Sequence, residues 1–432
     1  MQAKWNIVPI SELYEGLYDG PHATPKTSES GPVFLGIKNV TDDGHLDLSD
    51  IRHIAEEDYA TWTRRVEPRP GDIVFTYEAT LNRYAIIPEG FRGCLGRRMA
   101  LIRTDANKVD RGFLFYYFFS PAWREVITNN MMTGATVDRI PLITFPKFPV
   151  RVPPLPVQRR IACILSAYDE LMENSQQRIR FLEAMTRAIY REWFEHFRIP
   201  GHEKLPRVAS LIGEIPKGWE VKPLESLMTD HIGGGWGKDV ADEDYTEPAW
   251  VIRGTDIPDA RLSQVADVPH RFHTVQNIRT RRLQAGDILF EVSGGSKGQP
   301  VGRTSLVTPQ LLSALGDESV ICASFCKRVR PDAVGYGSEL LYLSFLEGYE
   351  SGEIEQFQVQ STGISNFKWT EYIAQTHRVV PPAALREKFR AHVAPMFSQI
   401  ATLGLQIANL RRTRDLLLPR LLSGQVSLSV KK

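Results

Sequence analysis

The stretch RVPPLPVQRRI at residues 151–161 opens a long amphipathic pattern, and VVPPAALREKF at 379–389 opens a second one, 228 residues further on. Beyond each Pro-Pro pair, seam positions recur at alternating spacings of four and three, along 161–193 and again along 389–421. This spacing is typical of the heptad seam of a coiled coil. Because the two seams match position for position, we expect the two helices to pack on each other.

A polar residue interrupts both seams at the same place, Thr186 in the first and Arg414 in the second. The predicted helix–helix contacts are Tyr168, Met172, Ile179, Leu182, Ile189, Met396, Ile400, Leu403, Ile407, Leu410 and Leu417. The alternative interpretation is that each helix is an amphipathic core helix within its own globular domain.

Local signals near the front of each helix predict an interruption. Ser166 followed by Asp169 has the spacing of a helix N-cap and its capping partner. Pro395 suits the first turn of a helix and would kink a helix interior. We therefore predict a short helix, a bend, and then long helices over 167–195 and 395–418, each a rod of roughly 40 Å.

Three further pairs of matching stretches extend the repeat over most of the chain. They keep the same order in both halves: WNIVPISEL (5–13) with WEVKPLESL (219–227), GDIVF (71–75) with GDILF (286–290), and TGATVDRI (133–140) with TGISNFKW (362–369). Their offsets agree apart from one change in length of about 14 residues. This pattern indicates a tandem duplication.

The segments between the helices contain short β-type runs, turn residues and an aromatic-rich stretch, GFLFYYFFS at 112–120, which we read as a buried helix. This mixture predicts the α+β class. The predicted boundaries are 1–153 for the first globular domain, 154–205 for a central helical spacer, 206–381 for the second globular domain and 382–432 for a C-terminal helical spacer.

The bulk composition excludes several classes of protein. The chain has 432 residues, a formal net charge of +1 and four cysteines. Its longest apolar run falls short of the roughly 20 residues of a membrane span, and we expect no signal peptide. So few cysteines indicate a reducing compartment, by default the cytoplasm, and Cys322 and Cys326 are expected to be free thiols rather than zinc ligands. The near-zero net charge argues against nucleic-acid binding by bulk charge, but it allows a local basic cleft.

Two glycine-rich stretches resemble catalytic or phosphate-binding motifs without the required context. GGSKG at 294–298 fits the nucleophile elbow of hydrolases, but QPVGRTSLV follows where that elbow requires a helix. HIGGGWGK at 231–238 fails the residue spacing of a phosphate loop. We therefore predict a protein that binds rather than catalyses, with no metal or cofactor of its own.

Two stretches resemble a known family. PPLPVQRRIACILSAYDELMENSQQRIRFLEAM (153–185) is similar to the central region of the specificity subunit of type I restriction–modification systems, and NLRRTRDLLLPRLLSGQVSL (409–428) is similar to its C-terminal region. The resemblance covers essentially the whole chain. It implies two target-recognition domains held apart by an antiparallel pair of long coiled-coil helices. Each domain would read one half of a split double-stranded DNA sequence, and a rod of the predicted length would span half-sites one helical turn (~34 Å) apart.

The same resemblance places the chemistry in partner subunits. In this family, modification subunits methylate adenine with S-adenosylmethionine, and a restriction subunit uses ATP and Mg to translocate and cut DNA. The resemblance implies two modification subunits docked on the helices, a restriction subunit, and a non-catalytic role for this chain.

Polar loops at matching positions of the two halves are the predicted DNA contacts, because arginine and lysine suit guanine edges and asparagine suits adenine. In the first half these residues are Lys38, Asn39, Asn82, Arg83, Tyr84, Arg97, Arg98, Thr133, Gly134 and Thr136. In the second half they are Lys238, Arg253, Thr255, Ser293, Gly294, Gly295, Ser296, Lys297, Arg303, Thr362, Gly363 and Ser365. For each of them a solvated surface loop is the alternative.

Other functions stay open at this point. The chain fits equally a modification-only or type IIB-like system that has no translocating motor. An enzyme built on the glycine-rich loops would lose its activity with Ser296→Ala. A scaffold that pairs proteins through its helices would not read DNA at all.

Overall fold

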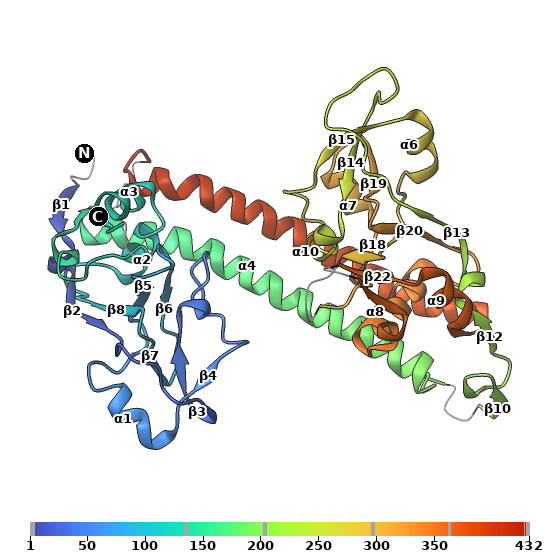
Figure 1. Cartoon of the computed structure of the whole chain (residues 1–432), viewed down its shortest axis with the longest axis horizontal. Coiled ribbons are helices and arrows are strands. Elements are labelled where there is room, and N and C mark those ends of the chain that lie inside the picture. Colours follow the sequence, from blue (N-terminus) through green and yellow to red (C-terminus); the bar gives the residue numbers. More distant parts are fainter. Residues whose placement is uncertain are drawn as a thin grey trace. The chain divides into compact units, whose positions relative to one another are not determined.

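A computed structural model of the chain describes residues 5–133, 137–201, 205–294, 299–361, 364–426 and 428. The chain divides into two compact units. Unit 1 consists of residues 1–170 and 411–432, and unit 2 consists of residues 171–410. Figure 1 labels the helices and strands of both units.

Unit 1 contains nine strands and three short helices among its described residues. The strands are β1 (Asn6–Pro9), β2 (Tyr14–Asp19), β3 (Ser28–Leu35), β4 (Arg52–His53), β5 (Ile73–Thr76), β6 (Tyr84–Ile86), β7 (Gly93–Leu95), β8 (Met99–Thr104) and β9 (Pro149–Val152). The helices are α1 (Tyr59–Trp62), α2 (Arg111–Tyr117) and α3 (Pro121–Asn130). A four-stranded antiparallel sheet has the order β2-β8-β5-β6, and a three-stranded sheet has the order β4-β3-β7, in which β3 and β7 are parallel.

Unit 2 repeats this framework and adds to it. Its strands are β10 (Arg207–Ser210), β11 (Gly213–Pro216), β12 (Glu220–Pro223), β13 (Met228–Gly233), β14 (Glu247–Ile252), β15 (His270–His273), β16 (Ile288–Glu291), β17 (Ser293–Gly294), β18 (Thr304–Leu306), β19 (Ser319–Cys322), β20 (Cys326–Pro331), β21 (Gln358–Ser361), β22 (Ile364–Phe367) and β23 (His377–Val380). Its short helices are α5 (Ile257–Ala260), α6 (Val275–Arg281), α7 (Pro309–Ala314), α8 (Ser338–Glu350) and α9 (Trp369–Gln375).

The strand orders confirm that the fold is a duplicated α+β body. The four-stranded sheet of unit 2 has the order β13-β20-β16-β18, which is the order of the unit 1 sheet in terms of chain position. The three-stranded sheet β15-β14-β19 again contains one parallel pair, β14 with β19. The pairs β1-β9 and β12-β23 correspond in the same way. The hairpin β10-β11 and the sheet β17-β22-β21 are the additions of unit 2.

The repeated Gly-Asp motif has the same structural role in both units. In unit 1, the buried Asp72 carboxylate accepts two hydrogen bonds from the Arg103 guanidinium, at 2.9 and 2.7 Å, and one from the backbone N–H of Arg69 at 2.8 Å. Asp287 of unit 2 accepts the equivalent bonds from Arg330, at 2.7 and 2.8 Å, and from Gln284 N–H at 2.8 Å. The aspartate therefore closes a turn and holds the neighbouring strand, which explains why the motif recurs.

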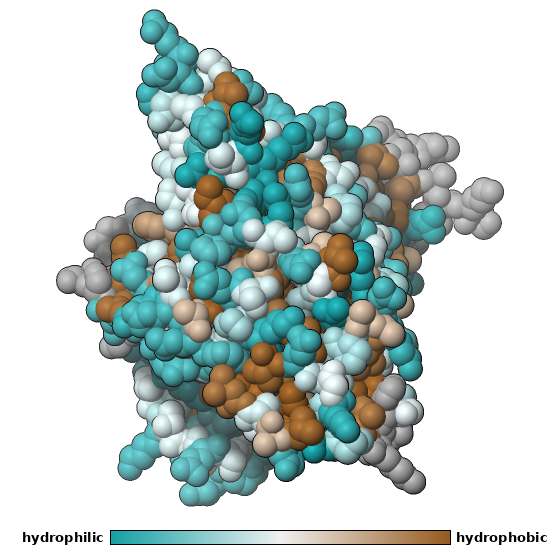
Figure 2. Space-filling model, turned by 90° about the vertical axis from the view of Figure 1, so that its right-hand side faces the viewer, coloured by the Kyte–Doolittle hydropathy of each residue, from teal (hydrophilic) through white to brown (hydrophobic). Residues whose placement is uncertain are grey.

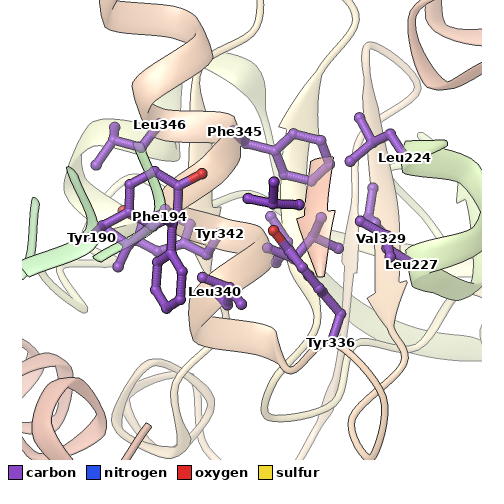
Figure 3. Close-up of a cluster of buried hydrophobic side chains, with 14 of the residues drawn as sticks. Tyr190, Phe194, Leu224, Leu227, Val329, Tyr336, Leu340, Tyr342, Phe345 and Leu346 are labelled. Atoms are coloured by element: carbon purple, nitrogen blue, oxygen red, sulfur yellow. The ribbon is translucent and has the colours of Figure 1, made fainter. Parts of the chain in front are cut away.

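Aromatic helices cover the central sheets. In unit 1 the aromatic-rich stretch forms the buried helix α2, which begins where the Asp110 side chain accepts a hydrogen bond from Phe113 N–H. In unit 2, α8 takes this place, and Figure 3 shows its Phe345 in one cluster with Val329 of β20 and Leu224. Burying each such side chain contributes about 1.5–3 kcal/mol, so these clusters dominate the stability of each unit.

The two long helices are uninterrupted, so the predicted bends are wrong. They are α4 (Leu155–Tyr190), followed by a π-helical turn at Arg191–Glu195, and α10 (Ala383–Leu422). The Ser166 hydroxyl donates to the carbonyl of Cys163, 3.4 Å away, and so lies within the helix instead of capping it. Pro395 costs its helix about 3 kcal/mol. Burial of Phe389, Val393 and Ile400 on the same helix outweighs that cost.

Within unit 2, α4 and α10 run antiparallel. The rings of Trp193, in the π-helical turn that follows α4, and Phe389, early in α10, lie with centroids 5.8 Å apart. Earlier in α4, Thr186 lines a small cavity together with Phe397 and Ile400, which come later in α10. The predicted contacts Met172, Ile179, Leu182, Ile400, Leu403, Ile407 and Leu410 form one apolar cluster there. Ile189 and Met396 are half-buried in the same unit.

Within unit 1, the start of α4 and the end of α10 pack into the globular core. Leu417 packs against the core cluster of the body and Leu421 is buried in it, and Tyr168 is half-buried. The two polar seam positions differ in their surroundings: Arg414 donates a hydrogen bond to the Asp169 carboxylate at 2.6 Å, whereas Thr186 lies among apolar side chains of unit 2. Because the ends of the helices belong to the bodies, the units do not end where the helices begin.

None of the described helices is long and apolar enough to span a membrane. Figure 2 shows a face that is largely hydrophilic, with apolar residues in small separate groups.

Candidate nucleic-acid interface

A basic cavity of about 380 Å³ in unit 1 brings together residues from four separate stretches of the chain. Its cationic lining residues are Lys38, Arg52, Arg97 and Arg98, and Thr24, Gly36 and Gly96 supply small residues around them. Three of these four cations, Lys38, Arg97 and Arg98, were predicted to contact DNA. The fold places all four around one cavity, beside the β7–β8 turn. Concentrated guanidinium groups around a cavity provide donors for phosphate oxygens or for the acceptor edge of guanine.

The four cations differ in how they are held. The Lys38 ammonium pairs with Asp50, and Arg98 lies 3.3 Å from the Glu78 carboxylate. Arg97 and Arg52 are exposed, and among the described residues no carboxylate lies within ion-pair distance of either. These two guanidinium groups therefore have their donors available for a ligand.

Backbone hydrogen bonds identify the corresponding turn in unit 2. In unit 1, Tyr77 N–H donates to the carbonyl of Arg98 at 3.2 Å. In unit 2, Val292 N–H donates to the carbonyl of Phe325 at 2.9 Å. Each donor follows the central strand that starts at the Gly-Asp turn, so Phe325 occupies the position of Arg98.

A glycine in each unit confirms this correspondence. Gly20 N–H donates to the carbonyl of Met99, and Gly234 N–H donates to the carbonyl of Cys326, both at 2.9 Å. A Cβ atom at either glycine would lie about 2.1 Å from a backbone oxygen. The glycine-rich stretch at 231–238 therefore permits a close approach of two chain segments, which is why it does not form a phosphate loop.

None of the four cations of unit 1 has a charged counterpart in unit 2. Paired strands and matching hydrogen bonds align Lys38, Arg52, Arg97 and Arg98 with Thr255, Pro269, Ser324 and Phe325. Thr255 is exposed, and the Phe325 side chain is 53% exposed. The two surfaces therefore share a backbone framework but present different chemical groups.

Unit 2 has instead a loop before β14 with two aromatic rings that each contact a cation, and four acidic residues at 239–244 accompany its single lysine, Lys238. Trp236 is 41% exposed, and the Arg271 guanidinium lies 4.3 Å from the centroid of its ring. The predicted contact Lys238 is exposed, pairs with Asp242 and lies over the ring of Tyr245. Stacked aromatic and cationic groups of this kind suit contact with bases and phosphates.

Below this loop lie two buried polar groups. His273 is fully buried, and its Nδ1 lies 2.9 Å from the amide nitrogen of Asn277. Burial, reinforced by the charges of Arg271 and Arg281, holds the pKa of His273 below its ordinary value. The imidazole is therefore neutral near pH 7 and supports the loop without adding charge.

The late loop of unit 2 adjoins the segment that follows the Gly-Asp strand. Ser293 pairs with Asn366 and Gly294 pairs with Ser365 in the β17·β22 ladder. The Ser293 hydroxyl donates to the Asn366 side chain at 2.8 Å. In unit 1, Glu78 and Arg139 form the corresponding bridge, and Arg139 also bridges Met132, the residue before the exposed Thr133. The predicted residues Gly134, Thr136, Gly295, Ser296, Lys297, Thr362 and Gly363 lie outside the described residues.

Two predicted DNA contacts are corrected by their burial. Asn39 is 3% exposed, and its amide donates to the carbonyls of Asp47 and Asp50 at 3.0 and 3.1 Å. Tyr84 is 1% exposed, and its hydroxyl accepts a hydrogen bond from the indole of Trp123 at 2.8 Å. Both side chains support the loop or the core from inside, because the local sequence pattern does not show which way a polar side chain points.

Three predicted arginines are already paired with carboxylates. Arg303 donates to Glu291 at 2.8 and 2.6 Å, and Arg253 donates to Asp256 in a similar two-pronged arrangement. Arg83 lies 2.6 Å from the carboxylate of Asp42, while Asn82 beside it has the positive φ of 62° that a tight turn requires. These side chains order the loops, so direct contact with DNA would require them to exchange partners.

Sequence reasoning missed Arg52, Trp236 and Phe325. Arg52 lies in a two-residue strand, and Phe325 lies in CASFC, which drew attention only as a candidate metal motif. No group of three or more potential metal-ligating side chains occurs among the described residues. Burial raises the pKa of Cys322 to about 12. The missing signal was positional: aligning CASFC with the arginines of the first half would have placed Phe325 at the position of Arg98.

Comparisons with known proteins agree with this architecture. A family model described as the type I restriction modification DNA specificity domain matches residues 61–184. The MjaIX specificity subunit of a type I restriction enzyme from Methanocaldococcus jannaschii is 24% identical over 383 residues, which is 87% of this chain and 82% of that protein. The putative MjaX specificity subunit from the same organism is 25% identical over 231 residues, about half of each chain.

A solved structure shares the fold. The S subunit of a type I restriction-modification system from M. genitalium superposes with a TM-score of 0.58 at 12% sequence identity, over 99% of this chain and 97% of that one.

Proposed function

Since this chain belongs to the family of type I restriction–modification specificity subunits, we propose that each of its two units reads one half of a split double-stranded DNA target. The observation that supports this proposal most directly is the repetition of one strand framework under two different surfaces. A protein that reads two unlike half-sites requires a constant scaffold and variable loops.

The antiparallel packing of α4 and α10 supports a spacer role for the helices. Two readers on one duplex engage half-sites about one helical turn apart, and a shared helix pair would set that distance. Joining both readers in one chain also makes the second binding event intramolecular, so that two weak contacts combine into one strong one.

The proposal assigns the chemistry to other chains. Modification subunits carrying S-adenosylmethionine, two per complex, would methylate adenine, and a restriction subunit with ATP and Mg would translocate and cut DNA. This chain would select the site and dock the modification subunits along its helices, in the cytoplasm where DNA is accessible. A modification-only or type IIB-like system would use the chain in the same way.

Long-read detection of N6-methyladenine tests the proposal. The gene would be expressed together with its neighbouring methyltransferase gene in a host that lacks both, and each gene alone would serve as a control. We expect a split motif that appears only when both genes are present. If a soluble complex forms and no new motif appears, the DNA-reading function is refuted and a helix-mediated scaffold becomes the better explanation.

A further inference from the structure

We propose that the two units read their half-sites with different chemistry: unit 1 reads guanine through Arg97 and Arg52, and unit 2 reads thymine through the ring of Phe325. The inference rests on the proposed DNA-reading function and specifies what each unit reads. It starts from the alignment of the two strand frameworks, in which four cations of unit 1 correspond to four uncharged residues of unit 2.

In unit 1, the guanidinium groups of Arg97 and Arg52 have hydrogen-bond donors available for a ligand. Arg97 and Arg52 line the same cavity and have no carboxylate partner among the described residues. The Tyr77 hydroxyl donates to the Arg97 carbonyl at 3.0 Å, so the backbone that presents the guanidinium is held in place. A guanidinium presented from this backbone can match the O6 and N7 acceptors of guanine in the major groove, and this pairing discriminates against the other bases.

In unit 2, the ring of Phe325 is exposed on a turn whose backbone is fixed. The Phe325 carbonyl accepts hydrogen bonds from Val292 N–H at 2.9 Å and from Ser293 N–H at 3.2 Å. The turn closes on itself where Cys326 N–H donates to the carbonyl of Ala323 at 2.9 Å. With its backbone fixed and its side chain 53% exposed, the ring presents an apolar surface at the position of Arg98.

An apolar ring at this position favours one base. Among the groups in the major groove, only the C5-methyl of thymine is apolar, and phenylalanine is one of the side chains that contact it. The neighbouring Ser324 carries no charge, whereas Arg97 does at the same position of unit 1. Unit 2 therefore lacks the guanidinium that favours guanine, because Ser324 replaces Arg97, and it presents instead an apolar ring that favours thymine, because Phe325 replaces Arg98.

The inference is tested by comparing the methylation motifs that the complete complex produces when it contains wild-type chain or a single variant. The wild-type motif is recorded first, followed by Arg97→Ala and Phe325→Ala. We expect Arg97→Ala to relax a guanine position in one half of the motif by about five- to a hundredfold, with the other half unchanged. We expect Phe325→Ala to relax a thymine position in the opposite half by roughly three- to tenfold.

Two matched variants control for general effects of removing a surface side chain. Arg92→Ala removes an exposed arginine of unit 1 that pairs with Glu56 outside the cavity. Val334→Ala removes a 95% exposed apolar side chain beyond the opposite end of β20. Both should leave the motif as it is. The yield of purified complex shows that each variant folds.

The outcomes separate the inference from the function on which it rests. No motif in the wild type refutes the DNA-reading function and the inference with it. A wild-type split motif with no G·C pair in one half, or with no A·T pair other than the methylated one in the other half, overturns the inference alone. So does a uniform loss of methylation in Arg97→Ala with an unchanged motif, because this would show that the arginine holds phosphates. Relaxation at the two predicted bases in opposite halves supports the inference.

Discussion

Asp72 of unit 1 and Asp287 of unit 2 make the same three hydrogen bonds, whereas the turns that flank their strands carry Arg98 in one unit and Phe325 in the other. The aspartates are 3% and 2% exposed, and a change at either would leave a backbone N–H without its partner and remove two hydrogen bonds from a partly buried arginine. The turn side chains face outward, so a change there costs the fold little. The comparison shows where a duplicated scaffold is constrained and where it is free to diverge.

The largest effect should come from removing the shared buried aspartates. Asp72→Ala and Asp287→Ala each break a buried charge pair, which costs about 3–5 kcal/mol. We expect the two losses to agree within about 1 kcal/mol, because the two networks have the same geometry. Hydrogen exchange of each unit in urea measures the free energy of unfolding separately.

The control for this experiment is Arg92→Ala, because Arg92 and Glu56 form an exposed pair in unit 1. Exposed ion pairs contribute little, so this variant should unfold like the wild type. If the two aspartate variants lost strongly unequal amounts of unfolding free energy, the two hydrogen-bond networks would share a geometry without contributing equally to stability.

A smaller effect is expected at the polar position of the helix seam, where the two units differ. Arg414 pairs with Asp169, which also accepts a hydrogen bond from the Tyr116 hydroxyl. Arg414→Leu should cost about 2–3 kcal/mol in unit 1, because it leaves the partly buried carboxylate without its cation. The double variant Asp169→Leu/Arg414→Leu should recover most of that loss. Chemical denaturation of the three proteins measures the difference.

The matching position in unit 2 sharpens this comparison. The Thr186 hydroxyl donates to the carbonyl of Glu183 in its own helix at 2.8 Å, so Thr186→Val loses one neutral hydrogen bond and should change stability by no more than about 1 kcal/mol. A loss as large as that of Arg414→Leu would contradict the view that the two ends of the helix pair differ in chemistry.

The smallest expected effect is a pH dependence of local stability, confined to the loop before β14 in unit 2. His273 has a pKa below its ordinary value of 6.5, so the folded unit binds the proton less readily than the unfolded chain does. The stability that this group contributes is complete above about pH 6.5 and is lost as the pH falls toward the lowered pKa. Amide exchange at 233–238, measured relative to its intrinsic rate at each pH, should therefore accelerate as the pH falls from 7.5 to 5.5.

His273→Gln should remove this pH dependence, because the amide stays neutral throughout that range. Persistence of the acceleration in the variant would assign it to another group. Arg271 and Arg281 both contribute to the lowered pKa, but arginine does not titrate in this range.

Much of the fold could be predicted from the heptad spacing and the paired motifs, because each of these patterns is formed by residues close together in the chain. The duplication, the α+β class and the apolar helix contacts such as Ile179 and Leu403 follow from such local patterns. The bend predicted at Pro395 failed because a local preference of about 3 kcal/mol was set against the burial of several side chains from distant segments.

The candidate site depended more strongly on tertiary structure. The sequence by itself determined that the chain repeats one module, where the long helices run and which loops recur in both halves. Only the folded structure decided that Asn39 and Tyr84 point inward, that Arg97 and Arg52 share a cavity, and that Phe325 stands where Arg98 stands. The physical reason is that a repeat is encoded locally, whereas the direction and neighbours of a side chain depend on contacts between residues far apart in the chain.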